Sequence, residues 1–180
     1  MPPRVLNAID GVTPEIGFYL AGMEEVREQL CESIAGLSDD QIGRPAIPGA
    51  HALGALVLHI GEAEWYWMQM VVSGHKLNDE DRQAACWDVL DDPAAFLAKG
   101  YSAEFCLNEI KKIRGQTIDR LSSFNDSDLE LIFSIERRGE KREQSLRWIL
   151  HHLTDHEAQH KGQILMLKRL LGLKNEGLFN

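Results

Sequence analysis

The segment that decides the fold is residues 146–172, LRWILHHLTDHEAQHKGQILMLKRLLG. Ser145, directly before it, is a typical N-cap residue, and Gly172 at its end is a typical helix terminator. Apolar residues recur through the segment at helical spacing and form one stripe, which contains Ile149, Leu153, Leu167 and Leu171. The pattern predicts a long amphipathic helix that covers a hydrophobic core.

Three earlier segments carry similar apolar stripes between helix start and stop signals. Thr13-Pro14 opens the first as an N-cap followed by a proline, and Gly74 ends the second. The expected helices lie near residues 13–36, 50–73, 102–122 and 145–171. Four amphipathic helices predict an all-α protein, a four-helix bundle with long connections. The length of 180 residues predicts a single domain, residues 1–180.

The connections between these helices differ in character. Residues 38–49 are expected to form a loop with one short turn, and residues 75–92 a polar, irregular connection. Asp92-Pro93 is a helix start. In residues 129–144 apolar positions alternate with polar ones before a turn at residues 137–140, which predicts either a small hairpin or an extended crossover ahead of the last helix.

The chain is acidic, with a formal net charge of −9 at pH 7. This balance disfavours nucleic acid and anionic membranes as partners, because both are bound by clustered basic side chains. Cys31, Cys86 and Cys106 lack a CxxC spacing and are expected to be reduced thiols. The sequence contains no recognisable signal peptide and no apolar stretch of membrane-spanning length, so a cytoplasmic protein is expected.

The last predicted helix contains four of the seven histidines. His156 and His160 lie about 40° apart on the helical wheel, one turn apart, and both fall within the apolar stripe. A lone interior histidine more often binds a neighbouring carbonyl or hydroxyl group, but two neutral imidazoles at this spacing can bind one metal ion. The pair therefore predicts a metal site, provided that a third ligand comes from elsewhere.

His59 is the best candidate for the third ligand, because it lies at the flank of the apolar stripe on the second helix. His152 is the rival, since it precedes His156 by one turn. One ion does not easily take three ligands spread over about 12 Å of helix axis, so geometry favours His59. The other three histidines are expected on the surface: His51, His75 and His151.

Several neighbours of these histidines have candidate roles. Gln163 shares a face with His160 and is expected to bind at the metal site, orienting an imidazole or a bound water. Gly162 indicates either close packing of a neighbouring helix or a position at which the helix merely tolerates a glycine. Glu157 is expected to face solvent. Three acidic residues are candidate general bases: Glu62, Glu64 and Asp155. The aromatic run that follows His59 indicates either a pocket lining or, more often, core: Trp65, Tyr66 and Trp67.

These features together resemble the DinB superfamily of metal-binding four-helix bundles. The resemblance rests on LVLHIGEAEWYWMQMVVSG around His59 and on residues 146–172 around His156 and His160. Helix order, the long second connection and the chain length also fit, so the resemblance covers nearly the whole chain. The combination of an inward histidine on the second helix with HxxxHxGQ on the fourth is specific. Lys161 stands where an arginine is common, a departure that affects no ligand.

The resemblance implies a function as well as a fold. In the superfamily three such histidines bind one divalent ion, typically zinc or nickel, and the better-understood relatives use low-molecular-weight thiols such as bacillithiol, mycothiol or glutathione. The chain is therefore expected to be a metal-dependent transferase or hydrolase that activates a thiol or water for a small-molecule substrate. The alternative is a non-catalytic metal-binding bundle with a structural or stress-related role.

Two further expectations concern assembly and pH. A homodimer is expected, because relatives are often dimeric and the chain has more large aromatic residues than four slim stripes need: Trp65, Trp67, Trp87 and Trp148. Metal binding is expected to weaken below about pH 6, because a protonated imidazole cannot bind a metal ion.

Overall fold

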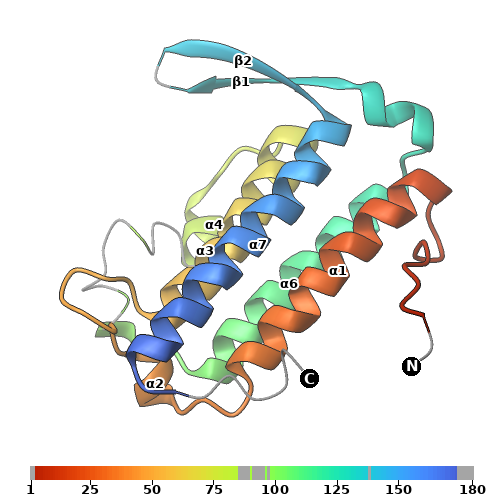
Figure 1. Cartoon of the computed structure of the whole chain (residues 1–180). Helices are drawn as coiled ribbons and strands as arrows, with labels where there is room; N and C mark the ends of the chain where they lie inside the picture. The colour runs from red at the N-terminus through yellow and green to blue at the C-terminus, as the bar shows by residue number, and fades with distance from the viewer. Residues whose placement is uncertain (1–2, 85–89, 91–95, 97, 138, 174–180) are drawn as a thin grey trace.

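Four long helices form a bundle in the computed structural model of the chain, which describes residues 3–84, 90, 96, 98–137 and 139–173 (Figure 1). The long helices are α1 (Pro14–Ile34), α3 (Leu53–Trp65), α6 (Ala103–Leu121) and α7 (Leu146–Leu170). Helices α1 and α7 run in one direction, and α3 and α6 run in the other (Figure 1). Helix α7 packs against both α1 and α3, and α3 also packs against α6. The predicted all-α bundle is confirmed.

Shorter elements fill the connections and extend α3. They are α2 (Asp39–Gly43), the π-helix η1 (Tyr66–Val72), α4 (Asp79–Ala84) and the 3-10 helix η2 (Asp126–Glu130). The second predicted helix is thus an α-helix that continues without a break as a π-helix. Helix α2 is the short turn expected in residues 38–49, and Ser38 closes its first turn with a capping box. The helix start expected at Asp92-Pro93 lies outside the described residues.

The predicted hairpin is present and lies across one end of the bundle (Figure 1). It consists of the antiparallel strands β1 (Ile132–Arg137) and β2 (Glu140–Ser145). Phe133 and Ile135 pack against the core below. Ser145 is both the last residue of β2 and the N-cap of α7, where its hydroxyl accepts a hydrogen bond from the backbone N–H of Trp148 at 3.2 Å. The strand therefore passes directly into the helix.

The start of α1 is capped differently from the expectation. Thr13 occupies the N-cap position, but its side chain makes no hydrogen bond to the first turn of the helix. Asp126 of η2 supplies that bond instead, because its Oδ1 accepts from the backbone N–H groups of Glu15 at 3.0 Å and Ile16 at 3.1 Å and from the Thr13 hydroxyl at 2.5 Å. The cap of the first helix thus comes from the segment that precedes the hairpin.

The hydrophobic core has two clusters, at opposite ends of the bundle. The first cluster includes Leu30, Leu53, Ile110 and Ile164. The second cluster includes Leu20, Met68, Leu121 and Leu150. Between the two clusters each long helix contributes one buried charged residue: Arg27, Glu64, Arg114 and Glu157. These four residues are called the charged layer below.

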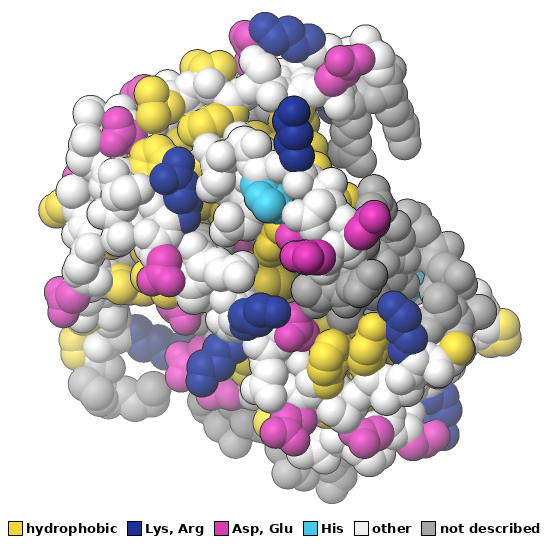
Figure 2. Space-filling view, turned by 180° about the vertical axis from the view of Figure 1, so that it is seen from behind, with side chains coloured by type: hydrophobic (Ala, Val, Ile, Leu, Met, Phe, Trp, Pro, Cys, Tyr) yellow, Lys and Arg dark blue, Asp and Glu magenta, His cyan; other side chains and the backbone are white. Residues whose placement is uncertain are grey.

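The surface shows charges of both signs. On the face in Figure 2, acidic side chains lie between basic ones, and hydrophobic side chains reach the surface in several places. Within the described part of the chain, no helix combines the length and the apolar character that a membrane span requires. Cys31 is a free, half-buried thiol and Cys106 is buried, whereas Cys86 lies outside the described residues.

Candidate metal site

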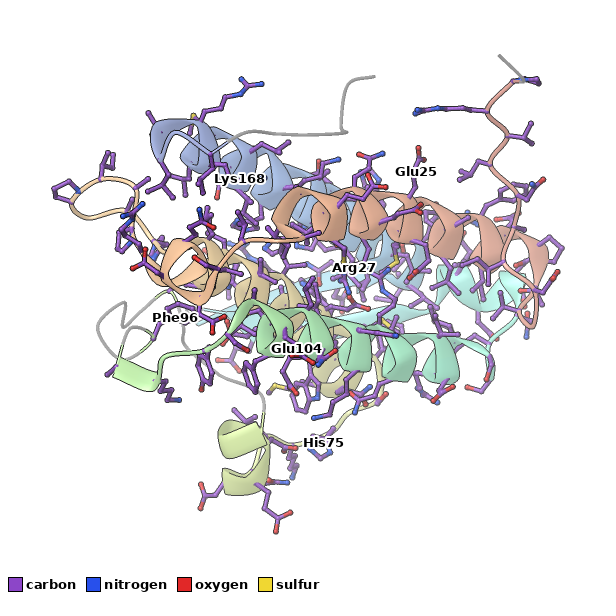
Figure 3. The ribbon with its side chains drawn as sticks, turned by 90° about the horizontal axis from the view of Figure 1, so that it is seen from below. Glu25, Arg27, His75, Phe96, Glu104 and Lys168 are labelled. Carbon is purple, nitrogen blue, oxygen red and sulfur yellow. The ribbon has the colours of Figure 1, made fainter. Side chains whose placement is uncertain are left out.

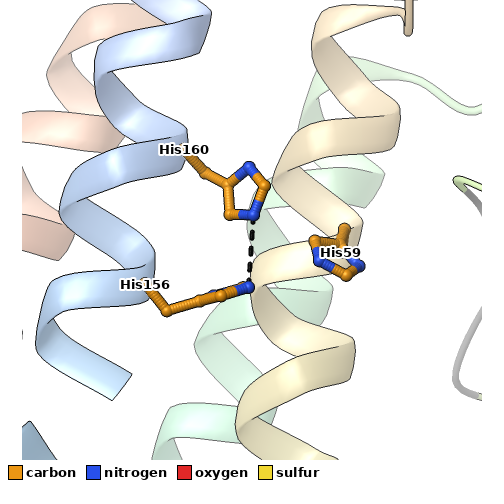
Figure 4. A group of neighbouring side chains, drawn as sticks. All are labelled: His59, His156 and His160. Atoms are coloured by element: carbon orange, nitrogen blue, oxygen red, sulfur yellow. Dashed lines mark hydrogen bonds between the residues drawn. The ribbon is translucent and has the colours of Figure 1, made fainter. Parts of the chain in front are cut away.

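Three histidines from two helices converge in the seam between α3 and α7 (Figure 4). One ring nitrogen from each of His59, His156 and His160 lies within 4.8 Å of the corresponding nitrogens of the other two. Nε2 of His156 and Nε2 of His160 are 3.2 Å apart. The ring centroid of His59 lies 5.1 Å from that of His156 and 4.9 Å from that of His160. The structure therefore brings together the three residues that the sequence predicts as metal ligands.

Two of the three imidazoles have a hydrogen-bond partner at Nδ1. Nδ1 of His160 lies 2.9 Å from Oε1 of Gln163, and Nδ1 of His59 lies 3.2 Å from Oε2 of Glu62. Both partner oxygens are acceptors, so Nδ1 donates in each case and the lone pair of each of these two rings lies on Nε2. Gln163 thus contacts the site as expected. Glu62, one of the candidate general bases, is half-buried against His59.

The environment of the two triad histidines on α7 favours their uncharged form. Burial, together with the nearby rings of His160 and His59, lowers the pKa of His156 to about 3. Burial, followed by the effect of His59, also lowers the pKa of His160. Neutral imidazole is the form that binds a metal ion. At His156 and His160, protons therefore compete with a metal ion only at a lower pH than they would at an ordinary histidine.

The charged layer lies beside the triad and joins all four long helices. Nε of Arg114 is 2.7 Å from Oε1 of Glu64, and its terminal nitrogen is 3.1 Å from Oε2 of Glu157. Arg27 binds the same two carboxylates and also donates to the carbonyl oxygen of Ile110 at 2.8 Å. Figure 3 shows Arg27 pointing from α1 into the bundle, whereas Glu25 points away from it. The two carboxylates on the triad-bearing helices are thus held by two shared arginines.

The expectation that Glu157 faces solvent is wrong, since its side chain is only 3% exposed. The wheel placed it off the apolar stripe, but the stripe is interrupted at this level, where the arginines occupy the interior. Residues 156–160, HEAQH, have the HExxH spacing in which two histidines bind zinc and the glutamate acts as a general base. Here both oxygens of Glu157 bind arginines, so this glutamate is not available as a base.

The other candidate bases are also accounted for. Glu64 is 2% exposed, and both of its oxygens bind arginines of the charged layer. Asp155 is exposed and accepts a hydrogen bond from Gln159 at 2.7 Å. Glu62 is the one of the three that touches the triad, through His59. The geometry assigns none of them to proton transfer.

The remaining histidines lie outside the triad. His151 is exposed as expected. His75 is also exposed, and its Nε2 lies 2.7 Å from Oδ2 of Asp81, whereas His51 is half-buried rather than on the surface. The ring of His152 stacks on Trp148, and its centroid lies 5.8 Å from that of His156. His152, the alternative third ligand, therefore packs against an indole and is not part of the triad.

Gly162 and the aromatic run after His59 have structural explanations. A Cβ atom on Gly162 would meet no atom within 4 Å, so close helix packing does not require a glycine here and the helix merely tolerates it. Trp65 and Trp67 are each 8% exposed and belong to the core, whereas Tyr66 is half-buried.

The charged layer was not predicted from the sequence. The only available signal was Arg27, which interrupts the apolar series of the first helix. One buried arginine requires a buried carboxylate nearby, and that requirement points to acidic residues at the same level of the neighbouring helices.

Comparisons with known proteins agree with this architecture. A family model described as mycothiol-S-transferase matches residues 20–171. Among curated proteins there is no match. A DinB-like protein from Bacillus cereus ATCC 10987 is 21% identical with a TM-score of 0.63, over 97% of this chain and 100% of that chain.

Two further solved structures share the fold. A conserved protein from Enterococcus faecalis is 14% identical with a TM-score of 0.65, over 86% of this chain and 95% of that one. YfiT from Bacillus subtilis, described as a probable metal-dependent hydrolase with an unusual four-helix bundle topology, is 17% identical with a TM-score of 0.59. The match with YfiT covers 97% of this chain and 95% of that chain.

Proposed function

Because the chain belongs to the mycothiol-S-transferase family, within the DinB superfamily, we propose that it is a metal-dependent enzyme that transfers a low-molecular-weight thiol to an electrophilic small molecule. The proposal includes His59, His156 and His160 as the ligands of one divalent ion, zinc or nickel. The observation that carries it is the convergence of these three imidazoles in the seam between α3 and α7.

The residues present fit such an ion. Two nitrogens bound to one tetrahedral ion at about 2.1 Å would lie about 3.4 Å apart. The observed separation of 3.2 Å between Nε2 of His156 and Nε2 of His160 is close to that value. Glu62 and Gln163 accept from the opposite side of two rings and hold Nε2 towards the centre, which is the usual support for histidine ligands.

The chemistry follows from the donor set. A divalent ion with three neutral ligands keeps its full charge and lowers the pKa of a thiol or water that it binds. In the transfer, the thiol loses its proton to solvent and its sulfur forms a bond to the electrophilic carbon. The leaving group departs with the electron pair of the broken bond. Glu62 and Gln163 act only by orienting His59 and His160.

The half-exposed triad favours this function over a purely structural metal site. Structural ions are usually enclosed by four protein ligands, whereas catalytic ions keep an open position. The group found among the described residues has three members, and the side chain of His59 is 26% exposed. Hydrolysis, with water in place of the thiol, uses the same site and is the second candidate, supported by the description of YfiT.

The decisive experiment combines elemental analysis with a panel of thiols. The purified protein is expected to contain about one divalent ion per chain. Its melting temperature should rise with mycothiol, bacillithiol or glutathione, and the metal-loaded protein should consume that thiol together with an electrophile. A protein that binds metal but neither binds nor consumes any thiol of the panel would contradict the transferase proposal and leave hydrolysis to be assayed.

We further propose that the protein is a cytoplasmic homodimer. Of the tryptophans that motivated this expectation, Trp65 and Trp67 are buried within one chain, and Trp148 is 43% exposed. Light scattering at micromolar concentration should give twice the chain mass of 20.3 kDa. A particle of the mass of one chain at all concentrations would contradict the proposal.

A further inference from the structure

We propose that a cavity at the end of the bundle remote from the hairpin binds a small free α-amino acid. The cavity lies where the ends of α1 and α7 meet α2, and its volume is about 250 Å³. Its polar side chains are Glu32, Gln41 and Lys168, and the rest of its lining consists of residues 35–37 and Leu173. Figure 3 shows Lys168 on α7 at this end of the bundle. The site is independent of the triad and of the proposed function.

Lys168 is the one buried charged residue in the described part of the chain that lies outside the charged layer, and it is only 4% exposed. Its Nζ donates to the backbone carbonyl oxygen of Ser33, and among the described residues no carboxylate pairs with it. Burial lowers the pKa of this lysine, and no neighbouring charge raises it. An unpaired charge in the interior is costly, so this position favours a ligand that brings a negative charge.

Lys168 and Gln41 can bind a carboxylate in the cavity. The ammonium group has three N–H bonds, of which the contact with Ser33 uses one. Oε1 of Gln41 accepts from the backbone N–H of Ser38 at 2.8 Å, which leaves the two N–H bonds of the Gln41 amide as donors. A carboxylate that enters the cavity therefore finds a positive charge and further donors.

Glu32 and the end of α1 supply the opposite charge at the rim. Glu32 is exposed and lies in the last turn of α1, which ends at Ile34. The last carbonyl groups of a helix carry the negative end of its dipole and favour a cation. A simple anion would be repelled at this rim, whereas a ligand ammonium group would be attracted. A molecule that carries a carboxylate and an ammonium group on one carbon satisfies both ends of the cavity.

Size and position agree with a small amino acid. A single water needs only about 10–15 Å³, so this cavity takes a molecule of several heavy atoms. The half-buried side chains of Leu37 and Leu173 provide apolar surface for a short side chain. Lys168 follows His160 by eight residues, about 12 Å along the helix axis, and it turns to α1 and not to α3. The cavity is therefore separate from the triad.

The test compares L-alanine with two molecules that each lack one of its charged groups. Propionate lacks the ammonium group, and ethylamine lacks the carboxylate. Binding to the full chain is followed by ligand-detected NMR titration at neutral pH and matched ionic strength. Because a hydrogen bond to a charged group is worth a factor of about ten or more, alanine should bind at least tenfold more tightly than either molecule.

Two substitutions remove the two charges of the site. Lys168→Met keeps most of the length of the buried side chain and should abolish alanine binding. Glu32→Gln should reduce the affinity for alanine to that for propionate, because the ligand ammonium group loses its partner. Glu32 is exposed, so this second variant decides even if Lys168→Met fails to fold.

The matched controls alter other residues of the same two helices. Glu28→Gln changes an exposed residue one turn before Glu32, and Lys161→Met changes a half-buried lysine two turns before Lys168 that binds Gln29. Both variants should bind alanine normally. Since α-amino acids also bind divalent ions, His156→Ala is the third control, and it should lose the metal but keep the alanine site.

Three results would overturn the inference: no binding of alanine by the wild type, equal affinities for alanine and propionate, or normal alanine binding by folded Lys168→Met. Loss of alanine binding in His156→Ala would assign the amino acid to the metal of the triad and overturn it as well. The proposed function fails separately, because a protein that transfers no thiol can still bind alanine in this cavity.

Discussion

Glu157 of α7 and Arg114 of α6 form an ion pair at 3.1 Å whose side chains are only 3% and 5% exposed. Glu157 follows His156 directly in the chain, so the same helical turn presents an imidazole to α3 and a carboxylate to the arginines. Glu64 pairs with Arg114 in the same way on α3, five residues after His59. The charged layer therefore fixes the relative positions of the two helices that carry the triad.

Removal of one arginine from the charged layer should strongly destabilise the protein. Arg114→Met leaves Glu64 and Glu157 to share Arg27, and an uncompensated buried charge costs about 3–5 kcal/mol. The matched control is Arg147→Met. Arg147 is 39% exposed and pairs with exposed Glu15 and Glu130, so its loss should cost less than about 1 kcal/mol. Urea denaturation of both variants checks the difference, and equal losses would show that burial does not decide the effect.

Stability should fall in acid through Glu64. Burial alone would raise the pKa of this carboxyl, but the charges of Arg114 and Arg27 outweigh it and lower the pKa to about 2. The pKa of Glu64 is lower in the folded protein than in the unfolded chain. The ionised carboxylate therefore stabilises the fold at pH values above the ordinary pKa of a glutamate, and this stabilisation is lost as the pH falls from about 5 to about 2. Denaturant titrations at several pH values should show this slope, and Glu64→Gln should flatten it. Parallel slopes for the two proteins would exclude Glu64 as the group responsible.

Metal content should depend on the triad residue by residue. His156→Ala or His160→Ala should abolish stoichiometric metal, because each removes one of three ligands, and His59→Ala should do nearly the same. Elemental analysis after gel filtration measures this directly.

Two histidines of the same helix serve as controls for that prediction. His151→Ala should leave the metal content unchanged, since the side chain is exposed. His152→Ala is the sharper control, because its ring is next in line after His156. If His152→Ala strips the metal and His59→Ala does not, the ligands lie along one helix and the assignment is wrong.

Much of this architecture was predictable because it depends on local patterns. The four helices, the hairpin and the histidine pair follow from periodicity, caps and turn residues, which act over a few positions of the chain. The charged layer was not predictable in the same way. A helical wheel places Glu157 relative to the apolar stripe of its own helix, but its burial depends on Arg27 and Arg114, which are far away in sequence.

The role of Glu62 and the π-helix escaped prediction for related reasons. The side chain of Glu62 adopts a rotamer that is stabilised by a hydrogen bond to Nδ1 of His59 at 3.2 Å. A helical wheel gives only the average direction of a side chain and does not predict such a rotamer. No residue type in the sequence marks the start of η1 (Tyr66–Val72), which contacts β1 of the hairpin.

Two glycines within helices should respond oppositely to alanine. At Gly162 an added Cβ meets open space, so Gly162→Ala should stabilise the protein by about 1 kcal/mol through helix propensity. At Gly61 the added Cβ would lie 3.0 Å from Cδ1 of Ile113 and 3.1 Å from Cγ2 of Ile110. The cost of this crowding should exceed the gain in helix propensity, so Gly61→Ala should lower the free energy of unfolding by about 1 kcal/mol. Thermal unfolding of both variants measures the signs, and stabilisation by Gly61→Ala would contradict the packing described for α3 and α6.

Ser145 gives the hairpin a mechanical role. Because one residue ends β2 and caps α7, no flexible linker separates the strand from the helix, and a rotation of one must turn the other. The hairpin is therefore a rigid extension of α7, the helix that carries His156 and His160. A spin label at Lys141, near its tip, and a second on α6 should therefore report small reorientations of α7 as larger changes in distance.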